Sequence, residues 1–296
     1  MKSFTVYLVE EGRREKTITT YVNEVKKFEK WYVDTFGEFT QENVSVLDVR
    51  DYIQYLKNTA KNKKGGKLSP VTISKKIESL RTYFRFLKEK GIINENPVEK
   101  IKLPKIQKRT EEPRWLTRNE KNKLVRFLND GTSNIHIRNK AICYMMMHVG
   151  FRISEVVTLE ISDIDFQKQI VGIEGKGGKY RRVEMNKDSI NAIKDWLKVR
   201  PQRESERMFI SQKGDLTTDG IQHIFRSLRK QTGLEELTPH VLRHTFGHDL
   251  AEKGYTIQLI ADLMGHSDIN TTRIYVRPGS QERRSAVDSI SSEVDE

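Results

Sequence analysis

The chain has 296 residues, of which 36% are hydrophobic and 32% charged, and it carries a formal net charge of +12. The length suffices for one large domain or two ordinary ones. The charge favours a polyanionic partner, nucleic acid before an acidic membrane surface, although a basic protein without such a partner stays open. The one cysteine, Cys143, excludes a disulfide framework and a cysteine-based zinc site within one chain. No apolar stretch is long enough for a signal peptide or a membrane span, so we expect a cytosolic protein.

The first hundred residues show helical patterns throughout. Residues 17–36 place Tyr21, Val25, Phe28 and Tyr32 on one face, at steps of four, three and four. A flexible basic loop, KNKKGGK, follows at residues 61–67. The N-terminal part is therefore predicted to be all-helical.

A second helix, over residues 69–91, has the clearer pattern. Ser69 is a good N-cap, Pro70 suits the first turn, and Gly91 ends the helix. The apolar stripe consists of Ile73, Ile77, Leu80, Phe84 and Leu87. Five cations lie off this stripe and are expected to face outward, namely Lys75, Lys76, Arg81, Arg85 and Lys88.

Positive charge is concentrated around this second helix. Residues 57–108 contain 15 lysines and arginines against 4 acidic residues, a net charge of +11. A single charge run is usually a solvated helix face, but an excess of this size favours a surface that follows a phosphate backbone. The five cations of the helix are therefore predicted to contact nucleic acid.

Residues 103–114, LPKIQKRTEEPR, combine prolines and cations with little apolar periodicity, which predicts an extended linker. We place the domain boundary near residue 110, giving domains 1–110 and 111–296. Thr117 and Glu120 form a capping box at the start of the next helix.

The second domain is predicted to be mostly helical with one small sheet. A central buried helix is expected over residues 137–149, ending at Gly150. Residues 169–174 and 180–185 are two short strands joined by the turn GKGGK, which makes a β-hairpin. Further helices are expected around residues 190–197, 221–228, 241–250 and 257–263. The fold class is thus mainly α with a small β-hairpin, ending in an acidic tail.

Two C-terminal segments, TPHVLRHTFGHDL and LMGHSDINTTRIY, carry the residues suited to phosphodiester chemistry. Attack on a phosphodiester builds charge on the non-bridging oxygens, and arginine is suited to bind two of them at once. Arg152, in GFRISEV, and Arg243 are the candidates for this clamp. His240 and Arg243 share a helix face, and the helix N-terminus favours a neutral His240 that accepts a proton. His244 and His248 are one turn apart, a spacing that can bind zinc, but the lack of an HExxH motif around them disfavours a zinc site.

His266 lies in a tight turn, GHSD, ahead of Tyr275. Tyrosine is a poor nucleophile until its proton is removed and the developing negative charge is stabilised. Neighbouring cations would favour both. Lys176, in the hairpin turn, is placed to protonate a leaving oxygen, with Lys179 as the competing choice. Taken singly, each of these residues would have an ordinary structural explanation.

Together these motifs resemble the tyrosine recombinase (phage integrase) family, and within it the compact Xer-like members. The motifs that carry the resemblance are GFRISEV, GKGGK, HVLRHTF and LMGHSDINTTRIY, in this order. The resemblance covers nearly the whole chain. It implies an N-terminal, SAM-like helical core-binding domain that clasps DNA, followed by a mostly helical catalytic domain.

The resemblance also implies a mechanism for site-specific recombination. Tyr275 would attack the scissile phosphate to form a 3′-phosphotyrosyl link, with Arg152, Arg243 and His266 stabilising the transition state. Lys176 would protonate the leaving 5′ oxygen and His240 would handle the tyrosine proton. No metal or other cofactor is expected, because the covalent link keeps the energy of the phosphodiester.

The resemblance implies that the partner is double-stranded DNA with a specific recombination site. It also implies a homo-tetramer on two duplexes, which could include a paralogue. This assembly would exchange strands through a Holliday junction. Residues 280–296 are a candidate for docking on a neighbouring subunit. Two alternatives remain: a type IB topoisomerase or telomere-resolving relative, and a DNA-binding protein that has lost catalysis. The Xer-like motifs and the short length argue against the first alternative, and the six intact positions argue against the second.

Overall fold

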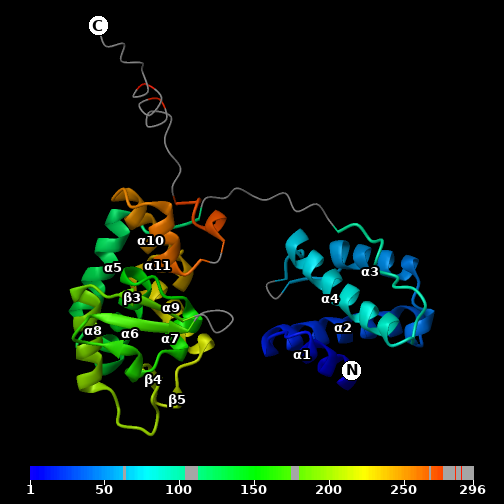
Figure 1. The fold of residues 1–296 in the computed structure, drawn as a ribbon, viewed down its shortest axis with the longest axis horizontal. Helices are drawn as coiled ribbons and strands as arrows, with labels where there is room; N and C mark the ends of the chain where they lie inside the picture. The colour runs from blue at the N-terminus through cyan, green and yellow to red at the C-terminus, as the bar shows by residue number, and fades with distance from the viewer. Residues whose placement is uncertain are drawn as a thin grey trace. The chain divides into compact units, whose positions relative to one another are not determined.

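The computed structural model describes residues 1–62, 65–103, 113–174, 180–266 and 268–275, together with residues 284 and 288. The chain divides into two compact units, Met1–Thr110 and Glu111–Glu296. Both units are mainly helical, which confirms the predicted fold class (Figure 1). No helix in the described ranges is long and apolar enough to cross a membrane.

The N-terminal unit is built from α1 (Lys2–Glu10), α2 (Glu15–Phe36), α3 (Val46–Asn58) and α4 (Pro70–Glu89). Helix α4 packs against the other three. Ser69 caps it by accepting a hydrogen bond from the Thr72 amide at 3.2 Å, and Pro70 occupies its first turn, as predicted. The five residues of its apolar stripe are all buried.

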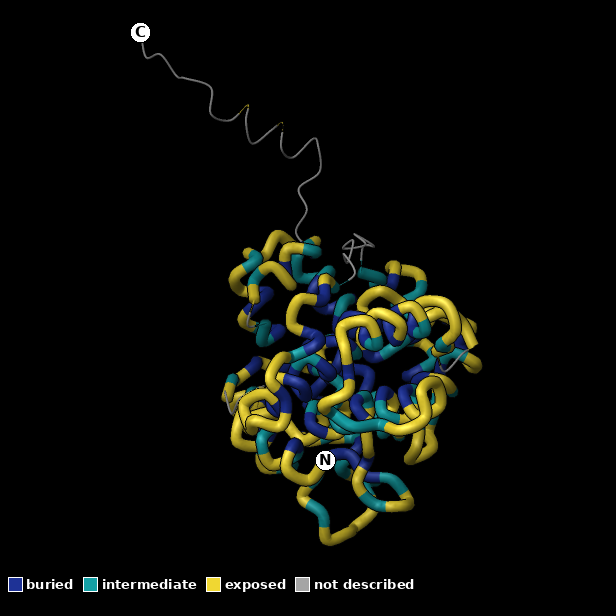
Figure 2. Tube along the Cα trace, turned by 90° about the vertical axis from the view of Figure 1, so that its right-hand side faces the viewer, coloured by how far each residue is buried: buried dark blue, intermediate teal, exposed yellow. Residues whose placement is uncertain are grey.

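Helix α4 is nevertheless more central than its stripe alone predicts. Ser74, Ser79, Thr82, Tyr83 and Phe86 are buried as well, because neighbouring helices cover most of its circumference. In both units the buried positions lie inside and the exposed positions lie on the outer sides of the helices (Figure 2). Only a narrow part of α4 therefore remains open to solvent.

The C-terminal unit contains α5 (Arg118–Asp130), α6 (Asn134–His148), α7 (Ile153–Thr158), α8 (Lys187–Val199), α9 (Thr218–Thr232), α10 (Pro239–Glu252) and α11 (Ile257–Met264). The predicted capping box of Thr117 and Glu120 is present at the start of α5. Helix α6 is the predicted central helix: residues 141–147 are all buried, and α8 and α10 pack against it. Helix α6 thus supports α10, which carries His240 and Arg243, and it also contacts α7.

A three-stranded antiparallel sheet in the order β1-β2-β3 accompanies these helices. It consists of β1 (Ile164–Asp165), β2 (Ile170–Glu174) and β3 (Tyr180–Glu184), with Val171 opposite Val183. Strands β2 and β3 confirm the predicted hairpin, although their connecting turn at 175–179 lies outside the described residues. A small second hairpin pairs β4 (Ile210–Ser211) with β5 (Gly214–Asp215).

Candidate active site

Arg243 is the most deeply buried of the predicted site residues, with 5% of its surface exposed. It lies on α10, which starts as the sequence predicts: the Thr238 hydroxyl accepts from the Val241 amide at 3.2 Å and Pro239 fills the first position. The guanidinium of Arg243 donates to the carbonyl oxygens of Gly150 and Met264. A full positive charge is thus held in the interior by backbone carbonyls.

Arg152 stands at the N-cap of α7 and is about one-third exposed. Its backbone amide donates to Glu155 Oε2 at 2.7 Å, and its guanidinium donates to Glu155 Oε1 at 2.8 Å. The same guanidinium donates to the carbonyl oxygen of Gly265 at 2.7 Å. Glu155 therefore fixes both the backbone and the side chain of this arginine.

Glu155 is the centre of a group of three arginines. Besides Arg152, it accepts hydrogen bonds from Arg181 of β3 at 3.0 and 3.2 Å, and Arg243 lies 3.8 Å away. Burial would raise the pKa of this carboxyl, but the ion pairs with Arg181 and Arg152 outweigh it and lower the pKa. Neither Glu155 nor Arg181 was predicted from the sequence as a site residue. The one signal for Glu155 was its position three residues after Arg152, where a capping-box acid occurs.

The C-terminal end of α11 is the meeting point of the two predicted clamp arginines. Arg243 donates to the Met264 carbonyl and Arg152 to the Gly265 carbonyl. Gly265 ends the helix with φ +61°, a left-handed conformation that glycine adopts without strain. Its place also requires glycine, because a Cβ there would lie 2.7 Å from the Arg181 guanidinium.

His266 follows this glycine and points its Nδ1 at the hydroxyl of Thr272, 2.8 Å away. Thr272 is fully buried, and its carbonyl oxygen also accepts from the Tyr275 amide at 3.0 Å. Burial, and then the positive charges of Arg243 and Arg152, lower the pKa of His266 to about 4. The imidazole is therefore neutral at pH 7. Thr272 was not predicted as a site residue.

Tyr275 lies in a recess between α10 and α11, with 7% of its surface exposed. Its ring packs with Phe246, Ile260 and Met264. Gly247 makes room for it, since a Cβ on that residue would lie 2.9 Å from the tyrosine ring. Burial raises the pKa of Tyr275 to about 12, and the nearby Arg243 opposes the shift only in part.

The hydroxyl of Tyr275 contacts His244 Nδ1 at 2.5 Å. Burial, and then the charges of His240 and Arg243, lower the pKa of His244 to about 4. His240 itself is exposed, and the centre of its ring lies 6.4 Å from that of His244. The structure thus places the tyrosine hydroxyl at His244, a residue for which the sequence suggested only a disfavoured role as a zinc ligand.

Zinc binding by His244 and His248 finds no support in this geometry. His244 is engaged by Tyr275, while His248 stacks on Trp115 with ring centres 4.1 Å apart. His248 does come near Asp249 and Glu252, but Asp249 pairs with Lys121 at 2.6 Å. These groups are explained by packing and an ion pair.

The structure brings five of the six predicted catalytic residues into one region of the C-terminal unit: Arg152, His240, Arg243, His266 and Tyr275. They come from the start of α7, from α10 and from the segment after α11. Lys176, and its competitor Lys179, lie outside the described residues. Burial also lowers the pKa of Arg243, to about 9, with a further contribution from Arg152. The buried Arg243 and the partly exposed Arg152 together form a site for an anion.

The five predicted DNA-contacting cations of α4 differ in their availability. The prediction that all five face outward is wrong for Lys76, whose side chain is 14% exposed and pairs with Glu24 of α2. Arg81 donates to the carbonyls of Val98 and Ile101, at 3.4 and 2.9 Å. Lys76 thus pairs with a neighbouring helix and Arg81 with the segment that follows α4, so both cations serve packing within the unit.

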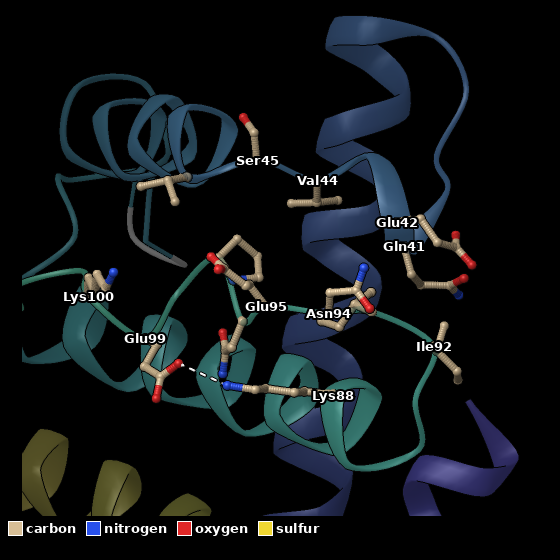
Figure 3. A pocket seen from close by; sticks show the side chains of 14 residues that line it. Gln41, Glu42, Val44, Ser45, Lys88, Ile92, Asn94, Glu95, Glu99 and Lys100 are labelled. Atoms are coloured by element: carbon tan, nitrogen blue, oxygen red, sulfur yellow. Dashed lines mark ion pairs between the residues drawn. The ribbon is translucent and has the colours of Figure 1, made fainter.

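Two more of these cations are exposed but paired. Arg85 Nη2 lies 2.9 Å from Glu11, and Lys88 Nζ lies 3.5 Å from Glu99. The Lys88–Glu99 pair is at the edge of a cavity of about 590 Å³ that holds none of the predicted catalytic residues (Figure 3). Lys75 is exposed and has no carboxylate partner among the described residues.

Comparison with known proteins agrees with this fold. Residues 114–282 match the model of the phage integrase family, and residues 1–91 match the phage integrase N-terminal SAM-like domain. The chain is 32% identical to tyrosine recombinase XerC of Bacillus subtilis (strain 168) over 285 residues, covering 93% of this chain and 90% of the relative. It is 30% identical to the TnP I resolvase of Bacillus thuringiensis over 297 residues, covering 98% and 99%.

Solved structures share the fold. The Tn1549 transposon integrase in complex with a circular intermediate DNA has a TM-score of 0.74 at 21% identity, over 97% of this chain and 98% of that one. XerH bound to its difH substrate has a TM-score of 0.71 at 23% identity, over 93% and 79%. The fold, the site and these matches define a tyrosine recombinase. The chain belongs to the phage integrase family, whose tyrosine recombinases cleave and rejoin DNA strands.

Proposed function

We propose that this protein recombines double-stranded DNA at a specific site, with Tyr275 as the nucleophile. The observation that carries the proposal is the meeting of Arg152, Arg243 and His266 around the turn that ends α11, with Tyr275 nine residues further on. Two arginines and a histidine around one point would match the charge that grows on the non-bridging oxygens of a phosphodiester.

In the proposed reaction the Tyr275 oxygen attacks the scissile phosphorus, forming a 3′-phosphotyrosyl link and freeing a 5′-hydroxyl. Arg152, Arg243 and His266 stabilise the transition state, and Lys176 donates a proton to the leaving 5′ oxygen. The covalent link keeps the energy of the phosphodiester, so a 5′-hydroxyl from a partner duplex reverses the step without ATP or metal. The family resemblance gives the handling of the tyrosine proton to His240.

A nicked suicide substrate tests the proposal. The wild-type protein should form a covalent DNA complex, and Tyr275→Phe should form none. Tyr255→Phe is the matched control, because Tyr255 is an exposed tyrosine in the same unit. Absence of a covalent complex with any cognate DNA would favour a binding protein without catalysis, and activity abolished by EDTA would contradict the metal-free mechanism.

We also propose that the working assembly is a homo-tetramer on two duplexes, and that residues 280–296 dock on a neighbouring subunit. The proposal follows from the family resemblance and from the length of chain that remains after Tyr275. Deletion of residues 283–296 should change the cooperativity of DNA binding or the cleavage rate. Unchanged synapsis and cleavage would refute the docking role.

A further inference from the structure

Two histidines of α10, His240 and His244, lie one turn apart near the site and differ in their contacts and burial. Nδ1 of His244 lies 2.5 Å from the Tyr275 hydroxyl, while His240 is exposed and, within the described residues, has no hydrogen-bond partner. We infer that His244, rather than His240, receives the proton of Tyr275 when the tyrosine attacks DNA. The inference rests on the proposed function, in which Tyr275 is the nucleophile.

The proton stays on the tyrosine in the free protein. The pKa of Tyr275 is raised to about 12 and that of His244 lowered to about 4, in both cases chiefly by burial. The hydroxyl therefore donates and Nδ1 accepts, which requires that the neutral imidazole carry its own proton on Nε2. This arrangement aligns the transfer before DNA arrives but leaves the nucleophile uncharged.

A bound phosphate would change this balance in the direction that cleavage needs. Electrostatic repulsion from His240 and from the guanidinium of Arg243 disfavours protonation of His244. A phosphate held by the two clamp arginines brings negative charge to the same place, offsets that repulsion and raises the proton affinity of His244. Activation of the tyrosine would then depend on occupation of the arginines by DNA.

The chemical step balances. The bond between the Tyr275 oxygen and phosphorus forms as the bond between phosphorus and the 5′ oxygen breaks. The tyrosine proton passes to His244 Nδ1, and the 5′ oxygen takes a proton from Lys176. In rejoining, the 5′-hydroxyl returns its proton to Lys176 as it attacks phosphorus, and His244 returns its proton to the leaving tyrosine oxygen. Neither an oxidant nor a further reactant is needed.

Chemical rescue distinguishes the two histidines. Full-length wild type, His244→Ala, His244→Asn and His240→Ala are compared for single-turnover cleavage of the nicked substrate, with and without added imidazole. A proton acceptor in such a step contributes about 100-fold or more to the rate. We expect His244→Ala to lose about that factor and to regain at least tenfold with imidazole. His244→Asn, which keeps an oxygen acceptor near the Nδ1 position, controls for folding and for placement of the tyrosine.

A second measurement decides the case in which imidazole rescues neither variant. Nitrogen-15 NMR of the free protein reports which ring nitrogen of His244 is protonated. The Nε2–H form supports the inference, and the Nδ1–H form overturns it. Two kinetic results would also overturn it: cleavage by His244→Ala at the wild-type rate, or rescue by imidazole of His240→Ala alone. The covalent complex of the wild type and its loss in Tyr275→Phe test the proposed function separately.

Discussion

Glu155 and Arg181 form a two-point ion pair that joins the start of α7 to strand β3, with nitrogen–oxygen distances of 3.0 and 3.2 Å. The same carboxylate accepts from Arg152 and lies 3.8 Å from Arg243. One buried acid thus offsets three guanidinium groups beside the proposed phosphate site. Without it, Arg152 and Arg181 would lose the carboxylate that accepts their hydrogen bonds.

Glu155→Gln should therefore reduce both stability and cleavage. Loss of one partner from a buried ion pair costs about 3 to 5 kcal/mol, because the remaining charge is left without compensation. Thermal unfolding measures the first effect and suicide-substrate cleavage the second. A variant that melts and cleaves like the wild type would contradict the central role of this carboxylate.

The stability effect of Glu155 should also depend on pH. In the folded protein the pKa of the Glu155 carboxyl lies below its ordinary value of 4.5. The carboxylate therefore stabilises the fold fully above pH 4.5, and this stabilisation is lost as the pH falls through the folded pKa. The difference in melting temperature between wild type and Glu155→Gln should be full at pH 7 and should shrink below about pH 4.5. A constant difference across this range would mean that charge is not the cause.

Thr272→Val should weaken cleavage through His266. The substitution keeps the side-chain shape but removes the hydroxyl that fixes Nδ1 of His266, so the imidazole would lose its set orientation. Removal of one buried hydrogen-bond partner costs about 1 to 3 kcal/mol, and we expect DNA affinity to stay near the wild-type value. Thr271→Val is the matched control, because Thr271 is exposed. Equal cleavage by the two variants would exclude this positioning role.

Gly247→Ala should displace Tyr275 from its recess. The new methyl group would lie 2.8 Å from Met264 Sδ and 2.9 Å from the tyrosine ring, closer than ordinary contact allows. We expect slower covalent-complex formation with little change in DNA binding. Gly220→Ala on α9 is the control, since the close neighbour there is the end of the Leu216 side chain. A wild-type cleavage rate in Gly247→Ala would show that the recess is not needed for reaction.

Lys75 and Lys76 are adjacent on α4 and should respond differently to alanine. Lys75 is exposed, so Lys75→Ala should lower DNA affinity and reduce the salt slope by about 1 without loss of stability. Lys76→Ala should mainly lower stability, because Glu24 would be left half-buried without that partner. Binding titrations at several salt concentrations and melting curves separate the two effects. An unchanged salt slope in Lys75→Ala would remove this face of α4 from the proposed DNA interface.

Local sequence patterns predicted those features that local physics determines. The N-caps Ser69, Thr117 and Thr238 all act as predicted, since a capping hydroxyl and its amide are three residues apart. The paired strands around GKGGK and the buried stripe of α4 follow from periodicity in the same way. Motif order, added to these patterns, was sufficient to identify the family.

Contacts between distant residues could not be predicted in this way. Lys76 meets Glu24 across 52 residues, and no helical pattern on α4 alone reveals a carboxylate on α2. His244 meets Tyr275 across 31 residues, whereas its spacing from His248 suggested only zinc binding, which the lack of an HExxH motif disfavoured. Both interactions depend on how helices pack, which the periodicity of one segment does not specify.

Helix α10 carries both Arg243, one arginine of the clamp, and Gly247, which makes room for the Tyr275 ring, and this fixes the distance between them. Arg243 and Gly247 are four residues apart on α10, about 6 Å along the axis at 1.5 Å per residue. The distance along the axis between Arg243 and the part of α10 that the tyrosine ring contacts is therefore set by the rise of the helix. Inserting one residue between them would rotate the recess by about 100° away from the clamp, while the tail beyond Tyr275 could vary in length without altering that distance.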